Sequence, residues 1–170
     1  MAFDDFLGSI ASERLRNVAL HWRGARGSRL MPAWSDIRPS RIGADLPLVW
    51  VYKYERADDS FIGRLAGDAI EQIIGKSFRG KPMSDLYAGH DYSGFFQRCK
   101  RVVCEPALMR SKGMVFQHVD RHGIGERIIM PLADNGTDGD GILGATIYDT
   151  IQGPAAGTEA EVPSWFALTT

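Results

Sequence analysis

The chain has 170 residues and a formal net charge of −1, which fits one ordinary domain without an overall positive field. Hydrophobic residues make up 44% and charged residues 24% of the sequence, as in globular domains. A chain of this length buries enough surface to fold without a disulfide or a structural metal, and its charge balance argues against nucleic-acid binding.

The first predicted element is an amphipathic helix over residues 1–27. Its apolar side chains recur every three or four residues, which places them on one stripe. Gly24 and Gly27 end the helix, and arginines occupy its last turn, where the helix dipole favours cations. The stripe has to be covered, either by the chain's own sheet or by a second subunit.

A β-hairpin is predicted after a proline-rich connector at 28–47. Residues 48–55 combine apolar, aromatic and β-branched side chains, which predicts a strand. The segment 57–60 has the composition of a turn, and 61–66 returns as a second strand.

Three helices are predicted next. Two short ones cover 69–74 and 83–87, and the glycines around them provide stops. The longest internal helix begins at Asp91 or Ser93 and runs to about Cys104, just before a proline.

The pattern after this helix is again typical of strands. Extended segments flank a turn at 111–113, and further strands are predicted at 126–132 and 142–151. Residues 153–170 are predicted to be a flexible tail, although a Trp-Phe pair near its end is unusual for a free segment. Two strands, then helices, then three strands predict an antiparallel α+β sheet rather than βαβ units.

This element order resembles the PAS fold, and short stretches of sequence resemble a family of small bacterial proteins with one PAS domain and an N-terminal helix. The resemblance implies a PAS domain over 28–152 with a five-stranded antiparallel sheet and helices on one face. The matching residues are 21–22, 30–32, 35–37, 39, 61–67 (FIGRLAG), 69, 75, 80–82, 84–86, 126–133 (ERIIMPLA) and 135–136.

The resemblance also implies a function. Such domains are sensory modules without catalytic activity that bind a small ligand or a protein partner and pass on a change of shape. Helices that flank them commonly form dimers, so we expect a homodimer. Its candidate interface residues are Phe3, Phe6, Leu7 and Ile10.

A ligand would occupy a cavity between the sheet and the helices. Aromatic side chains at the expected positions indicate such a cavity, although a stripe of this kind is also typical of a filled core. The candidate ligand-binding residues are Trp50, Tyr52, Arg64, Phe95, Phe96, Cys99 and Met130.

Arg64 is the charged member of this set. It lies within an apolar strand, and a buried charge is costly without a partner. Asp36, Asp68 and Glu126 are the candidate partners. Arg64 would either pin the connector to the sheet through a carboxylate or bind an anionic ligand.

No cofactor is predicted. Haem would need an axial ligand, for which His90 and Cys99 are weak candidates, because the first is expected in a loop and the second in the core. Flavin photochemistry in PAS domains uses a cysteine on an early helix, and the corresponding helices here have none. His118 and His122 have a spacing that suits a metal on a helix, but their neighbours favour a strand and a loop, so no metal site is predicted.

Two other functions remain open at this point. One is a dimeric adaptor with a filled core. The other is an enzyme of the ketosteroid-isomerase type, in which Tyr52, Tyr54 and Asp68 would act, although the strand order disfavours it. No phosphate loop or nucleophile elbow supports catalysis.

The compartment is inferred from the cysteines and the apolar runs. Cys99 and Cys104 would be about 8 Å apart on one helix, which exceeds disulfide reach, and two reduced thiols suit a reducing cytosol. The start of the sequence lacks the basic residues of a signal peptide, and the apolar runs are short for a membrane span. We therefore expect a cytoplasmic protein without membrane association.

Overall fold

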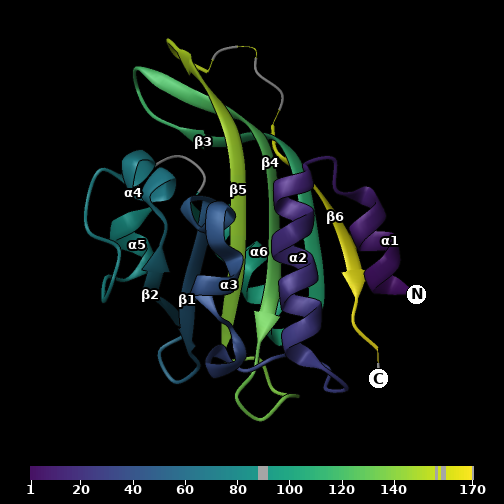
Figure 1. Cartoon of the computed structure of the whole chain (residues 1–170). Helices are drawn as coiled ribbons and strands as arrows, with labels where there is room; N and C mark the ends of the chain where they lie inside the picture. Colours follow the sequence, from purple (N-terminus) through teal and green to yellow (C-terminus); the bar gives the residue numbers. More distant parts are fainter. Residues whose placement is uncertain (88–91, 156, 158–159, 170) are drawn as a thin grey trace.

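An antiparallel sheet of six strands forms the centre of the structure, a computed structural model that describes residues 1–87, 92–155, 157 and 160–169 (Figure 1). The strand order is β2-β1-β5-β4-β3-β6. The predicted α+β class with an antiparallel sheet is confirmed. The strands are β1 (Val49–Glu55), β2 (Ser60–Ala66), β3 (Ala107–Gln117), β4 (Arg121–Leu132), β5 (Gly141–Gln152) and β6 (Val162–Ala167).

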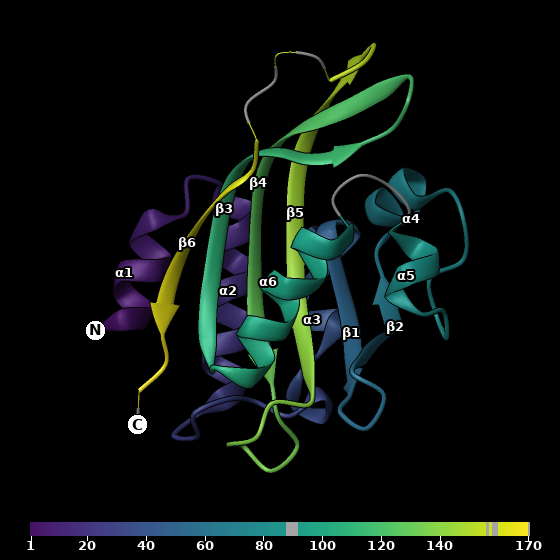
Figure 2. The same ribbon diagram turned by 180° about the vertical axis from the view of Figure 1, so that it is seen from behind.

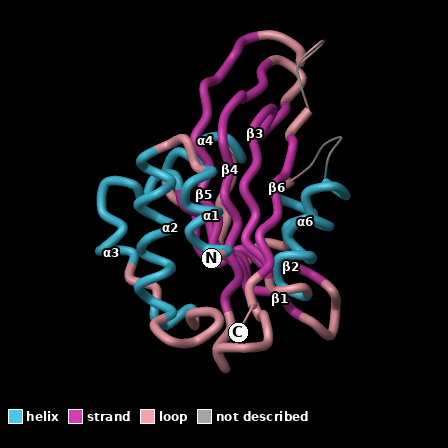
Figure 3. The backbone as a smooth tube through the Cα atoms, turned by 90° about the vertical axis from the view of Figure 1, so that its right-hand side faces the viewer, coloured by secondary structure: helices cyan, strands magenta, loops and turns pink. Residues whose placement is uncertain are grey.

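Helices cover both faces of this sheet, as Figures 2 and 3 show from two directions. One face carries the N-terminal helices, and the other carries the helices that follow the β1–β2 hairpin. The first group is α1 (Ala2–Ser9), α2 (Glu13–Arg26), η1 (Trp34–Asp36), α3 (Pro39–Ile42) and η2 (Gly43–Leu48). The second group is α4 (Asp68–Ile74), α5 (Met83–Leu86) and α6 (Tyr92–Cys104), with α6 lying across the sheet (Figure 2).

The sheet therefore separates two hydrophobic cores. Side chains of a strand point alternately to opposite faces, and β1 shows this directly. Val49 and Val51 belong to the core beneath α2, whereas Trp50 and Tyr52 belong to the core beneath α6. The second core positions the candidate site.

The predicted helix over residues 1–27 is divided into α1 and α2. The helix is interrupted at residues 10–12, and a buried carboxylate on β4 binds the backbone of this interruption. Glu126 accepts hydrogen bonds from the backbone N–H groups of Ala11 and Ser12 at 2.8 and 2.9 Å. Arg110 donates to the same carboxylate at 2.8 Å. Glu126 thus fixes where α2 begins on the sheet.

Replacing Glu126 by glutamine is expected to lower the free energy of unfolding by about 1–3 kcal/mol, because one amide oxygen cannot satisfy all three donors. Burial alone would raise the pKa of Glu126, but its backbone and Arg110 partners outweigh burial and lower the pKa below the ordinary 4.5. The carboxylate therefore stabilises the fold above pH 4.5, and this stability is lost as the pH falls through the lower folded-state pKa.

Urea denaturation between pH 7 and pH 3 measures both effects. The wild type should lose more stability than Glu126→Gln over this range. Equal losses in the two proteins would contradict the assignment of Glu126 as the anchor.

The candidate dimer residues are covered within a single chain. Phe3, Phe6 and Ile10 are buried in the core beneath the N-terminal helices, and Leu7 packs against it. Phe6 contacts Phe166 of β6 edge-to-face, with ring centroids 5.6 Å apart. The sheet of the same chain therefore covers the apolar stripe of α1, which is one of the two alternatives the sequence left open, and Phe3, Phe6 and Ile10 do not form an exposed interface. Dimerisation itself stays a prediction.

The sixth strand was not predicted. Residues 162–167, expected to be part of a flexible tail, form β6 and pair with β3. The strand alternates as a sheet requires, with Phe166 toward α1 and Trp165 beneath the guanidinium of Arg101 on α6, 4.2 Å from its ring centroid. Pro163 is compatible with a strand because β6 lies at the edge of the sheet.

The predicted turn at 111–113 is also wrong. β3 continues through this segment, and its pairing with β4 is irregular only between Met114 and Phe116. Gly113 adopts a positive φ of 124°, which only glycine adopts readily. A glycine at this position therefore looks like a turn residue in the sequence although the strand continues through it. Among the described residues, no helix combines the length and the apolar character that crossing a bilayer requires.

Candidate functional site

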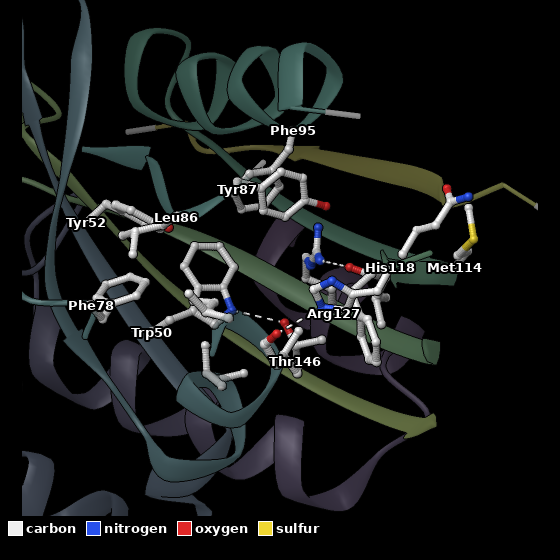
Figure 4. Close-up of a pocket in the computed structure, with 16 residues that line it drawn as sticks. Trp50, Tyr52, Phe78, Leu86, Tyr87, Phe95, Met114, His118, Arg127 and Thr146 are labelled. Carbon is white, nitrogen blue, oxygen red and sulfur yellow. Dashed lines mark hydrogen bonds between the residues drawn. The ribbon is translucent and has the colours of Figure 1, made fainter. Parts of the chain in front are cut away.

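A cavity of about 100 Å³ lies in the second core, between the sheet and the helices α4 to α6 (Figure 4). Its walls are mainly apolar and aromatic. Figure 4 shows Tyr52, Phe78 and Leu86 toward one end, and Arg127, His118 and Thr146 toward the other. The cavity therefore has an apolar end and a polar end.

Aromatic rings form the walls between these two ends. Trp50 packs against Phe95 with ring centroids 5.6 Å apart, and Tyr87 stacks on Phe95 with centroids 4.4 Å apart. The indole Nε1 of Trp50 donates to Thr146 Oγ1 at 3.0 Å. Burial raises the pKa of Tyr52 well above its ordinary value, so its hydroxyl stays protonated.

A buried guanidinium occupies the polar end. Arg127 on β4 donates through Nη1 to Glu161 Oε2 at 3.3 Å and through Nη2 to the Val115 carbonyl. Its guanidinium carbon lies 4.8 Å from the ring centroid of Phe95. Burial alone would lower the pKa of Arg127, but the Glu161 carboxylate and other neighbours raise it above the ordinary value. Arg127 is therefore charged.

Glu161 connects this end of the cavity to the C-terminal segment. It lies immediately before β6 and is buried. Besides Arg127, it accepts from Arg98 Nη1 at 2.7 Å and from Ser111 Oγ at 2.5 Å. One carboxylate thus joins α6, β3 and β4 to the segment that leads into β6.

The two histidines considered for a metal make separate contacts. His118 lines the cavity, and its Nε2 lies 2.9 Å from the Ile73 carbonyl of α4. His122 is buried on β4, with Nδ1 3.2 Å from the Gly153 carbonyl. No group of three His, Cys, Asp or Glu side chains within the described ranges could hold a metal. His90 and Asp91 lie outside the described residues.

Three of the candidate ligand-binding residues line the cavity: Trp50, Tyr52 and Phe95. Cys99 and Phe96 belong to the same core without lining it, and burial raises the pKa of the Cys99 thiol. Phe96 contacts Phe61 instead, with centroids 5.7 Å apart.

Met130 and Arg64 lie elsewhere. Met130 belongs to the core beneath α2, because β4 alternates and its neighbour Ile129 takes the cavity-side core. Arg64 is the extra residue of a β-bulge, since Val51 pairs with Leu65 and Tyr52 with Gly63. A bulge redirects its side chain.

The guanidinium of Arg64 consequently lies over the Trp34 ring, 5.4 Å from the centroid. Its proposed partners are engaged differently: Asp36 pairs with Arg29 at 2.6 Å, and Glu126 pairs with Arg110.

The residues proposed for an isomerase are not brought together at the cavity. Tyr54 donates to Asp59 Oδ1 at 2.6 Å, and Asp68 is exposed at the start of α4. Only Tyr52 of the three lines the cavity.

The sequence did not reveal Arg127, Thr146, His118 or Glu161 as site residues. Two adjacent charges, Glu126 and Arg127, at the start of an apolar strand were the available signal. Because the side chains of a strand alternate, one of the two had to enter each core.

Comparison with known proteins agrees with this architecture. The family model described as PAS domain matches residues 10–147 of the chain. No curated protein and no solved structure matches it significantly.

Proposed function

The chain belongs to the PAS domain family, and from this membership we propose that it is a sensory module whose cavity binds a small molecule without chemical turnover. Family membership supports the role of a sensory or interaction module. The cavity in the core beneath α6 is the observation that carries the finer proposal, because an apolar pocket with a few convergent polar groups is typical of ligand sites.

This cavity favours a ligand sensor over an adaptor with a filled core. An adaptor would need no space between the sheet and α6, since close packing stabilises the fold. Catalysis has less support, because Tyr54 and Asp68 do not line the cavity and burial raises the pKa of the Cys99 thiol.

The signal would leave the cavity through β6. Arg127 lines the cavity and binds Glu161, which directly precedes β6. β6 in turn contacts α1 through Phe166 and α6 through Trp165 and Arg101. A ligand that moves Arg127 would thus change its contact with Glu161, and through Glu161 the position of β6.

Output by association is the second part of the proposal. We expect a homodimer in solution that uses a surface other than the buried face of α1. Light scattering at micromolar protein should give twice the mass of 18.8 kDa. A monomeric mass would contradict self-association and leave a different protein as the partner.

Ligand binding is tested with two probes that contain one aromatic ring, benzoate and benzyl alcohol. The indole N–H signal of Trp50 in a ¹H–¹⁵N spectrum reports on the cavity, and Trp50→Phe identifies that signal. At least one probe should shift it saturably. Ile73→Phe, which enlarges a lining side chain, should abolish the shift while the protein stays folded.

Leu20→Ala is the matched control, because Leu20 is exposed on α2 on the other side of the sheet. It should bind the probes as the wild type does. Absence of any saturable shift with both probes would overturn the proposal of a ligand cavity.

A further inference from the structure

We propose that the cavity selects a small aromatic carboxylic acid, whose carboxylate binds Arg127 and whose ring lies against the aromatic walls. This inference rests on the proposed function and names the chemical class of the ligand. It comes from an arginine whose hydrogen-bonding capacity is incompletely used.

Arg127 is 4% exposed, and it lines the cavity. Its Nε has no hydrogen-bond partner within the described part of the chain. A buried donor without a partner destabilises the fold, so an arginine in this state favours a ligand that supplies an acceptor.

Glu161 does not fully satisfy this arginine. Its carboxylate is shared, with a 2.7 Å contact to Arg98 and a longer 3.3 Å contact to Arg127. The further partners of Arg127 are the Val115 carbonyl, which is neutral, and the Tyr87 side chain. A second carboxylate, brought by a ligand, would supply both the missing acceptor and negative charge.

The surroundings of Arg127 suit an in-plane approach. The guanidinium carbon lies over the Phe95 ring, 4.8 Å from its centroid, and the N–H groups of a guanidinium lie in its plane and match the geometry of a carboxylate. Thr146 is the cross-strand partner of Arg127. Its hydroxyl therefore lies beside the guanidinium at the polar end of the cavity (Figure 4).

The volume of the cavity and its apolar end indicate which group of the ligand lies beyond the carboxylate. An apolar protein cavity of ~150 Å³ can hold benzene, and this one is smaller, at about 100 Å³, so it excludes a ligand larger than one substituted ring. Tyr52 and Phe78, with centroids 4.7 Å apart, form the apolar end. A single ring with one carboxylate uses both ends.

Four probes of similar size test the class: benzoate, benzamide, benzyl alcohol and benzylamine. Calorimetry on the full chain should show benzoate binding at least tenfold more tightly than benzamide. Arg127→Met is combined with Glu161→Gln, because the buried Glu161 carboxylate would otherwise lose one of its two arginine partners. This double variant should lose the preference for benzoate and still bind benzyl alcohol.

Arg64→Met is the control, because it removes an arginine that lies over Trp34 outside the cavity. It should retain the wild-type preference. If the double variant does not fold, the wild-type comparison of benzoate with benzamide decides alone.

Equal affinities for benzoate and benzamide, or a preference for benzylamine, would overturn the carboxylate inference and leave the ligand-binding function standing. Failure of all four probes to bind would overturn both.

Discussion

Replacement of Glu161 by alanine is expected to lower the free energy of unfolding by about 3–5 kcal/mol, because it leaves a buried charge without its partner. Arg127 would keep the Val115 carbonyl and the face of Phe95, but it would lose its carboxylate. The hydroxyl of Ser111, which is fully buried, would lose its acceptor as well.

Urea denaturation at pH 7 measures this loss. Glu105→Ala is the matched control, because Glu105 forms an exposed ion pair with Arg101 on the surface of α6, and such pairs contribute about 0–1 kcal/mol. Adding Arg127→Met to Glu161→Ala should recover part of the loss, since the orphaned charge is then gone. Equal effects of Glu161→Ala and Glu105→Ala would show that the carboxylate is not the centre of the buried network.

The strands and the family could be predicted from local patterns. The aromatic and β-branched runs of β1 and β2 correspond to the strands found, and the apolar stripe that contains Phe95 and Cys99 correctly indicated α6. The order of elements and the short matching stretches then supported the PAS assignment, which the family match over 10–147 confirms. These features depend on neighbours in sequence, and a single sequence contains that information.

The errors occurred where a distant partner decides the outcome. β6 is a strand because β3 offers an unpaired edge, α1 offers an aromatic contact on one face, and Arg101 of α6 offers a cation–π contact on the other. The composition of the C-terminal segment taken alone is typical of a flexible tail. Glu126 likewise breaks the N-terminal helix from more than a hundred residues away.

The site was predictable only in its apolar part. Trp50, Tyr52 and Phe95 were identified because aromatic residues on a strand and on a facing helix indicate a shared core. The ion pair between Arg127 and Glu161 spans 34 residues, and it depends on a strand that the sequence did not predict. For Arg64 the sequence left two roles open, a structural pin and an anion contact, and the structure places its guanidinium over Trp34 at a bulge of β2.

The second large effect concerns the N-terminal helices. Trp22 of α2 is fully buried, stacks against Phe3 at 6.1 Å and donates from Nε1 to the Pro131 carbonyl at 2.8 Å. Trp22→Ala is expected to lower the free energy of unfolding by about 3–5 kcal/mol, through the cavity it creates. Trp22→Phe should cost less, about 1–3 kcal/mol, because it mainly leaves the Pro131 carbonyl without its donor.

Thermal and urea unfolding of both variants distinguish an integral helix from an accessory one. Leu20→Ala on the same helix is the control, since Leu20 is 47% exposed, and it should change the stability little. If α2 were an accessory that detaches during signalling, Trp22→Ala would leave the main transition unchanged. We expect a single transition at lower denaturant instead, because α2 packs on β4 and β5, the same strands that carry Arg127 and Thr146 on their other face.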